Sequence, residues 1–433
     1  MKTYIYADNY RGFSHACIPL EKVNFLVGEN STGKTSILDL IETFSDPRFW
    51  LLQPEFPQHS GEQQHFHDLV SASAPNRSTF TIGAVDANDS DTEKNYGMLV
   101  TYFGFDGRPS PKHISILRGR RIVTVDVVKS RGRDYITYKE EELEASDVRQ
   151  DGSLTRQWID LMALHHNSQD GFVKENSSEP NERYMPILLR LRSLSHSERN
   201  QFPDDASVPQ EFRASHLKFA PIRSRPRRTY DAPQTTFTPE GDHTPYLIKK
   251  RLSSTSTKRD FARFLEGAGE SSGLFKKVVL KKYGMDPMAP FEINVELGGK
   301  PLSLKNVGYG VSQALPLIVE MFVQKERTSF QFQQPEVHLH PRAQATFGDL
   351  IAERARTSDK LICVETHSDF LIDRFRLNVR RNDGIQAQIL FFERTENGNK
   401  VSPIAISASG DLDPSQPEAY RSFFLNESLA LLG

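Results

Sequence analysis

Cysteine is scarce in this chain of 433 residues, and long apolar runs are missing. Cys17 and Cys363 lie far apart, and neither belongs to a CxxC pair or to a Cys/His cluster with metal-ligand spacing. We therefore expect two reduced thiols rather than a disulfide framework. No apolar run approaches the roughly 18 residues that a membrane helix needs, and the N-terminus has no signal-peptide core. The expectation is a soluble, cytoplasmic protein.

An excess of charge of one sign is also absent. The chain has 54 Lys+Arg against 56 Asp+Glu, a formal net charge of -2. The whole molecule therefore has no electrostatic bias toward nucleic acid or membranes, and any such bias must be local. Internal repeats and sustained heptads are missing as well, so a long coiled-coil arm is not expected.

The length is typical of two or three structural units. Residues 1–139 combine short strands with a β-rich stretch from about Thr79 to Tyr138. Residues 140–289 follow irregular helical patterns, which predicts a mainly helical insertion. Residues 290–433 open with a hairpin at Phe291 and then alternate helix and strand. Helices are expected to begin near Ser312, Arg342 and Phe370. The sequence predicts an α/β fold with a β-rich N-terminal subdomain.

A glycine loop lies between an apolar strand and an amphipathic helix near the N-terminus. The strand KVNFLV precedes Gly28, and Ile37, Ile41 and Phe44 share one helical face after Lys34. A triphosphate needs backbone N–H donors, a cation and a hydroxyl for magnesium in this context. The residues expected to bind ATP are Gly28, Asn30, Ser31, Thr32, Gly33, Lys34, Thr35 and Ser36, with Lys34 on the β and γ phosphates and Thr35 on Mg²⁺. The alternative is a turn before an ordinary helix.

Four further stretches, one before this loop and three after it, carry a resemblance to a known family. NYRGF precedes the loop, and NVGYGVSQALP (306–316), FQFQQPEVHLHP (330–341) and LICVETHS (361–368) come after it. With these stretches the chain resembles the OLD-like and SMC-like ATPases, bacterial AAA-type "limiting" P-loop ATPases with an ABC-type head. The resemblance covers roughly residues 1–85 and 290–400 and implies a head that dimerises around ATP. Ser312, in the signature-like loop, would then approach the γ-phosphate bound to the other subunit. Alone, this stretch is equally a glycine turn capped by Ser312.

The stretch that resembles Walker B departs from the usual pattern. Gln333 and Gln334 stand where the magnesium-binding acid and the catalytic glutamate are expected. A neutral amide is a poor general base, although its oxygen can bind metal or orient water. We therefore assign Gln333 to Mg²⁺, Gln334 to orienting water, and the nearest carboxylate, Glu336, to activating it. His338 and His340 are expected to form a packed or phosphate-facing turn rather than a metal pair.

The strand LICVE ends in polar residues, at the place where α/β sheets carry functional groups. In the resemblance, His367 is the switch histidine that contacts the γ-phosphate. A histidine at a strand end is otherwise a structural residue, and only the other motifs favour the functional interpretation.

A basic stretch lies in the insertion. Between Arg213 and Arg263 there are twelve Lys/Arg and four Asp/Glu. Arg223, Arg225, Arg227 and Arg228 are concentrated there, so the stretch is a candidate for following a nucleic-acid backbone. An acidic protein partner or a solvated face remain as alternatives.

The resemblance implies an ATPase that controls a DNA-directed or nuclease-like partner in anti-phage defence or genome maintenance. OLD-type relatives carry a C-terminal TOPRIM nuclease, whereas here only about twenty residues follow the Asp411-Leu-Asp413 triplet. We therefore expect any nuclease to be a separate subunit. The alternative is a nucleotide-dependent scaffold with negligible turnover, which Gln333 and Gln334 motivate. A transporter ATPase subunit is a weaker alternative, because such chains keep their acidic Walker B residues.

Overall fold

The structure is a computed structural model that describes residues 1–56, 65–72, 74, 77–88, 91–130, 133–142, 154–174, 208–286, 288–324, 327–381 and 384–423. The chain forms two compact units, each assembled from three segments. The first unit comprises Met1–Glu21, Glu29–Ala214 and Phe392–Pro403, and the second comprises Lys22–Gly28, Ser215–Phe391 and Ile404–Gly433. The boundaries expected after residues 139 and 289 stay predictions. No helix among these described residues is long and apolar enough to cross a membrane.

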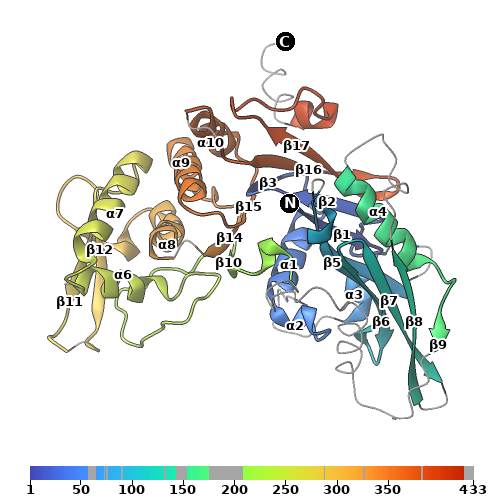
Figure 1. The fold of residues 1–433 in the computed structure, drawn as a ribbon. Helices are drawn as coiled ribbons and strands as arrows, with labels where there is room; N and C mark the ends of the chain where they lie inside the picture. The colour runs from blue at the N-terminus through green and yellow to red at the C-terminus, as the bar shows by residue number, and fades with distance from the viewer. Residues whose placement is uncertain are drawn as a thin grey trace. The chain divides into compact units, whose positions relative to one another are not determined.

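An eight-stranded antiparallel sheet dominates the first unit, in the order β2-β1-β4-β5-β6-β7-β8-β9 (Figure 1). Its strands are β1 (Lys2–Asp8), β2 (Ala16–Leu20), β4 (Thr79–Ala87), β5 (Tyr96–Phe105), β6 (Arg108–Arg118), β7 (Arg121–Ser130), β8 (Arg133–Glu142) and β9 (Val173–Lys174). The β-rich stretch expected from Thr79 to Tyr138 is confirmed. β1, β4 and most of β5 are buried at consecutive positions, so both faces of the sheet are covered at its centre.

Helices of the first unit bury their apolar faces. They are α1 (Lys34–Ser45), α2 (Pro47–Trp50), α3 (Phe66–Leu69) and α4 (Leu154–Asn167), with 3-10 turns at Thr92–Lys94 and Gln210–Phe212. Ile37, Ile41 and Phe44 of α1 are fully buried, as their spacing predicted. Trp158, Ile159 and Met162 of α4 pack in one cluster with sheet residues such as Leu99 and Leu117. Asp46 ends α1, and Pro47 begins α2 at a position where a missing N–H costs little.

A six-stranded sheet has the order β10-β14-β15-β3-β16-β17 and belongs to the second unit except for Phe392–Pro403, the tip of the β16–β17 hairpin, which belongs to the first. Its strands are β3 (Val23–Gly28), β10 (Ser215–Phe219), β14 (Thr328–Gln333), β15 (Ile362–Glu365), β16 (Ala387–Thr395) and β17 (Gly398–Ile406). β10, β14, β15 and β3 run parallel, so their carboxyl ends meet at one edge. Polar residues that follow these strands are therefore brought together.

Three helices follow strands of this unit, and two more precede a small sheet. The helices are α6 (Thr244–Ser253), α7 (Lys258–Ser272), α8 (Tyr309–Val323), α9 (Pro341–Thr357) and α10 (Asp369–Arg381). The small sheet is β11 (Lys277–Lys282), β12 (Phe291–Glu296) and β13 (Leu302–Ser303), followed by a 3-10 turn at Leu304–Asn306. The described part of the expected insertion is thus helix and strand together. α8 begins at Tyr309, three residues before the expected Ser312, because Gly308 rather than Ser312 is its N-cap.

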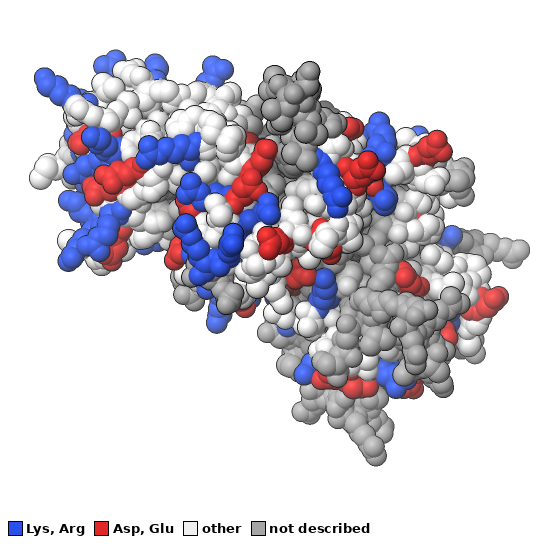
Figure 2. All heavy atoms as spheres, turned by 90° about the horizontal axis from the view of Figure 1, so that it is seen from above, with Lys and Arg blue, Asp and Glu red and all other residues white. Residues whose placement is uncertain are grey.

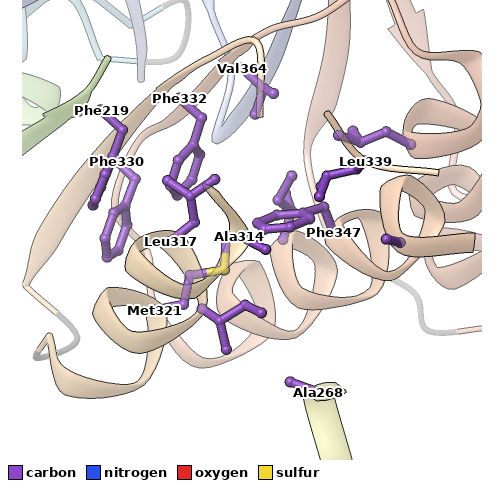
Figure 3. Packing of buried hydrophobic residues seen from close by; sticks show 14 of the residues in the cluster. Phe219, Ala268, Ala314, Leu317, Met321, Phe330, Phe332, Leu339, Phe347 and Val364 are labelled. Carbon is purple, nitrogen blue, oxygen red and sulfur yellow. The ribbon is translucent and has the colours of Figure 1, made fainter. Parts of the chain in front are cut away.

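The core of the second unit lies between the parallel sheet and α8. Phe219, Phe330 and Phe332 come from the neighbouring strands β10 and β14, and their rings stack. Figure 3 shows these rings close to Leu317 and Met321 of α8. The strands that carry the polar edge are therefore anchored by aromatic packing, which keeps their carboxyl ends in register.

Candidate nucleotide site

The glycine loop continues directly from the end of β3 and is closed by its own side chains. Thr32 Oγ1 donates to the Glu29 carbonyl at 2.8 Å, and Lys34 Nζ donates to the same oxygen at 2.6 Å. Thr32 and Lys34 are 2% and 3% exposed, whereas Asn30 and Ser31 at the tip are exposed. The loop therefore has a fixed shape, with its cation held at the base.

Gly33 cannot be replaced by a larger residue without rearrangement. Its φ is 95°, in the left-handed region, and it is the N-cap of α1. A Cβ at this position would lie 2.5 Å from Phe13 Cζ and 2.9 Å from the Asn399 side-chain nitrogen. The left-handed backbone of Gly33 and the close contacts of Phe13 and Asn399 together explain why this position requires glycine.

The N-terminus of α1 is open to an anion. No side chain caps it and its first turn has no acidic residue. Thr35 and Ser36 lie half-buried in this turn. A helix N-terminus leaves backbone N–H groups without helical partners and carries partial positive charge, so it favours phosphate. The residues expected to bind ATP are contiguous around this helix start.

An ion pair that no local sequence pattern predicts joins α1 to the NYRGF turn. Arg11 Nη1 lies 2.6 Å from Asp39 Oδ2, and the Asp39 side chain is fully buried. Tyr10 and Phe13 in the same turn are fully buried, and Phe13 is the ring that touches Gly33. The NYRGF turn therefore packs against the glycine loop through Phe13 and is joined to α1 through Arg11.

In the second unit, the turn after β14 is held against the end of β15. Gln333, the last residue of β14, is opposite Glu365 in the parallel register. Gln334 has φ 43°, and its N–H donates to the Glu365 carbonyl at 2.8 Å. Gln333 is a buried residue, 8% exposed. Glu365 is a buried carboxylate beside the two glutamines that sequence reasoning did not select.

Glu336 and His367 lie together. Glu336 Oε1 accepts the backbone N–H of His367 at 2.7 Å. Burial raises the pKa of Glu336, and the His367 N–H, Thr366 and Arg223 oppose that rise. Its Oε2 has no hydrogen-bond partner within the described residues. Two of the three residues that sequence reasoning assigned to catalysis, Glu336 and His367, are thus joined through the main chain.

Arg223 is not a surface residue, which corrects its assignment to a nucleic-acid patch. Its side chain is 1% exposed, and Nη2 donates to the Gln333 carbonyl at 3.4 Å. Its main chain exchanges two hydrogen bonds with the side chain of Gln313 on α8, at 2.8 and 3.2 Å. Burial excludes contact with an external phosphate backbone. By contrast, Arg225, Arg227 and Arg228 are exposed.

Arg223 and Glu336 are buried side chains of opposite charge that influence each other electrostatically without forming an ion pair within the described residues. Burial lowers the pKa of Arg223 to about 10, and the Glu336 carboxylate opposes that fall. Nε and Nη1 of Arg223 have no hydrogen-bond partner in the described part of the chain. A buried charge that lacks partners is costly, and such groups cluster at functional sites. Sequence reasoning missed this role because its partners lie 90 and 110 residues away.

The signature-like loop packs against the turn after β14. A Cβ on Gly310 would lie 2.8 Å from the His338 carbonyl oxygen. Ser312 is 6% exposed, and its hydroxyl donates to the Tyr309 carbonyl at 2.8 Å. Gly308 and Tyr309, rather than Ser312, are exposed at the start of α8. The contact of Ser312 with another subunit's nucleotide stays a prediction.

The two histidines of the turn have packing roles. The His340 side chain caps α9 by accepting the Ala343 N–H at 3.4 Å. The His338 ring is edge-on to Tyr309, with centroids 4.8 Å apart. No group of three or more His, Cys, Asp or Glu within the described ranges could hold a metal ion.

A family model described as "AAA domain, putative AbiEii toxin, Type IV TA system" matches residues 23–373. The chain belongs to this family. The match spans the glycine loop, the turn with Glu336 and the segment with His367, and it confirms the recognition of an AAA-type P-loop ATPase domain. No curated protein matches the chain.

Several solved structures resemble this one at low identity. An SMC head bound to the C-winged helix domain of ScpA has a TM-score of 0.45 and 12% identity, over 93% of this chain and 97% of that one. The SMC head domain from Thermotoga maritima has a TM-score of 0.39 and 12% identity, over 93% and 98%. The Smc head with an extended coiled coil bound to the C-terminal domain of ScpA, derived from Pyrococcus furiosus, has a TM-score of 0.43 and 11% identity, over 99% and 98%.

Proposed function

We propose that this chain binds ATP in the loop from Gly28 to Thr35 and hydrolyses it slowly. The observation that carries the proposal is the start of α1, where Lys34 closes the loop and the first turn has neither an acidic residue nor a side-chain cap. A cation and several backbone donors are thus available to one anion. Membership of a family of AAA domains supports ATP as that anion's source.

Each residue of the loop has a role in this proposal. Backbone N–H groups from Asn30 to Ser36 surround the phosphates, and Lys34 exchanges the Glu29 carbonyl for the β and γ phosphates. The Thr35 hydroxyl and the Gln333 amide oxygen are hard oxygen donors of the kind that Mg²⁺ takes. Both are neutral, so the phosphates supply the negative charge. When bound, Mg²⁺ neutralises charge on those phosphates.

Glu336 is the proposed residue for activating water. One of its oxygens is engaged by the His367 N–H, and the other has no partner among the described residues. Burial raises its pKa, which makes the carboxylate a stronger base at neutral pH. His367 lies beside it to contact the γ-phosphate, and Gln334 orients the water. Turnover is slow in this proposal because two amides occupy the positions of the usual acids.

Oligomerisation and a partner belong to the same proposal. The exposed start of α8 at Gly308 and Tyr309 offers backbone donors to a nucleotide held by a second copy, with Ser312 next to it in the same turn. The ATP-bound dimer then controls a separate effector, nuclease-like or DNA-directed, in anti-phage defence or genome maintenance. The toxin and toxin–antitoxin terms in the family's description support a defence role.

Nucleic acid is the second proposed partner, through three exposed arginines. Arg225, Arg227 and Arg228 follow one another closely along an extended segment. On the face drawn in Figure 2, basic and acidic side chains are interspersed, in keeping with the net charge of -2. A short basic segment rather than the whole molecule would therefore contact a phosphate backbone.

A scaffold with negligible turnover is the second candidate function. The observation that favours it is the pair Gln333 and Gln334, whose neutral side chains supply no base. A multiple-turnover phosphate-release assay separates the two candidates. Phosphate release above the buffer rate supports the enzyme, whereas tight ATP binding with release at the buffer rate supports the scaffold.

Lys34→Ala tests the phosphate loop. We expect it to abolish ATP binding, measured by titration calorimetry, because it removes the cation that faces the β and γ phosphates. Lys94→Ala is the matched control, since Lys94 is an exposed lysine paired only with Asp91 among the described residues. Unchanged ATP affinity in Lys34→Ala would refute the site.

Glu336→Gln tests the proposed base. The substitution keeps the shape and the acceptor for the His367 N–H but removes the proton affinity. We expect ATP affinity to stay within about threefold while turnover falls by roughly 10²-fold or more, the size of a typical general-base contribution. Wild-type turnover in this variant would assign the role to another residue, with His367 the next to test.

A further inference from the structure

The tip of the β16–β17 hairpin packs on the glycine loop within the first unit. The Asn399 N–H donates to the Gly12 carbonyl at 2.8 Å, and the rings of Phe392 and Phe13 are 6.5 Å apart. The Asn399 side-chain nitrogen lies 2.9 Å from where a Cβ of Gly33 would be. Residues more than 360 positions apart in the sequence thus share one small structure around the loop.

Arg394 on this hairpin contacts the loop itself. Its Nη2 donates to the Ser31 carbonyl at 3.2 Å. Ser31 is at the exposed tip of the loop, and its φ of 62° is left-handed. A left-handed residue turns the chain sharply, and the guanidinium holds the carbonyl that this turn directs toward it. The contact therefore places the guanidinium at the exposed tip of the loop.

The contact of Arg394 with the neutral Ser31 carbonyl leaves the positive charge of the guanidinium without a carboxylate to balance it in the described ranges. The Arg394 side chain is exposed, and it forms no ion pair with any carboxylate in the described ranges. Its neighbours on the hairpin, Lys400 and Glu393, pair with each other at 2.9 Å. A guanidinium has five N–H donors in a planar fork that matches phosphate oxygens, and the Ser31 carbonyl takes only one of them. The remaining donors lie beside the phosphate loop.

We propose that Arg394 is a second cation of the nucleotide site, which binds the phosphates of ATP from the tip of the loop. Lys34 holds the phosphates at the base of the loop, and Arg394 holds them at the tip. The inference rests on the proposed function, because it needs ATP in this loop. It adds a phosphate-binding residue from a hairpin more than 350 positions after the loop.

Arg394→Gln, Arg394→Lys and the control Lys400→Gln test the inference. ATP affinity is measured by titration calorimetry, and the melting temperature of the nucleotide-free protein is measured in parallel. We expect Arg394→Gln to weaken ATP binding about 10- to 100-fold, as for loss of a charge-assisted hydrogen bond, with an unchanged nucleotide-free melting temperature. Arg394→Lys should restore most of the affinity, and Lys400→Gln should match the wild type.

Two results would overturn the inference. One is unchanged ATP affinity in Arg394→Gln. The other is a loss of affinity that comes with a lower nucleotide-free melting temperature and is not restored by Arg394→Lys, since that pattern belongs to a structural brace. Lys34→Ala distinguishes the two levels of the argument. If it abolishes binding while Arg394→Gln has no effect, only the role of Arg394 is rejected, and if neither variant matters, the proposed site is rejected as well.

Discussion

Arg223 and Glu336 are buried side chains of opposite charge at the polar edge of the second unit's sheet. A nearby opposite charge favours the charged form of each group, so the two ionisation states depend on each other. Burial raises the pKa of Glu336, and Arg223 is among the groups that oppose this rise. Arg223 therefore acts on the proposed chemistry through Glu336 and is a positioning residue.

Replacing Arg223 should change the pH dependence of turnover. In Arg223→Met the opposing cation is lost, so the pKa of Glu336 rises further and its carboxylate form disappears at a higher pH. We expect the acid limb of the pH–turnover curve to move to higher pH while ATP binding is kept. Phosphate release from pH 5.5 to 9 measures this. Arg223→Lys keeps a cation and should move the limb less.

Arg225→Met is the control for this experiment, because Arg225 is two residues away and exposed. Its acid limb should coincide with that of the wild type. An acid limb of Arg223→Met at the wild-type position, with turnover retained, would show that Arg223 does not set the ionisation of Glu336.

At the scale of elements, local patterns were sufficient for most of the C-terminal third. Alternation and period predicted β15, α9 and α10, because each is decided by residues close together in the sequence. The start of α8 was missed by three residues, since Ser312 has the chemistry of a cap but Gly308 occupies that position.

Contacts between distant segments could not be predicted in this way. Arginines at 223, 225 and 227 alternate with other residues, and nothing local distinguishes the buried one from the exposed two. Arg223 is buried where its backbone N–H donates to the Gln313 side chain and its guanidinium donates to the Gln333 carbonyl. The Arg11–Asp39 pair and the Arg394–Ser31 contact depend equally on tertiary structure. The site was therefore predictable as motifs but not as a network.

Two glycines near the start of α8 differ in what surrounds them, which gives a matched test of its packing. A Cβ on Gly310 would lie 2.8 Å from the His338 carbonyl oxygen, whereas one on Gly308 would meet nothing within 4 Å. We expect Gly310→Ala to destabilise the protein by about 1–2 kcal/mol, because overpacking outweighs the gain in helix propensity. Gly308→Ala should be neutral. Urea denaturation measures both, and equal stabilities would contradict the packing described.

At the scale of the whole chain, opposite charges nearly cancel, so general charge repulsion does not decide its response to mild acid. Individual buried groups decide it instead. His166 on α4 is 1% exposed and held by Thr101 and Ser115, each at 2.7 Å. Burial lowers its pKa to about 3, so the folded protein keeps it neutral. In the unfolded chain its pKa returns to about 6.5.

The difference between the folded and the unfolded pKa of His166 predicts that the protein loses stability in acid. Because the folded pKa is depressed, the stabilisation is complete above pH 6.5 and is lost as the pH falls toward 3. Between pH 8 and pH 5 the free energy of unfolding should decrease by about 2 kcal/mol on account of His166. His166→Gln does not titrate, so it should be less stable at pH 8 but lose about 2 kcal/mol less on acidification. His67→Gln, at an exposed position, is the control. Equal pH dependence in the two variants, measured by urea denaturation, would contradict a neutral buried His166.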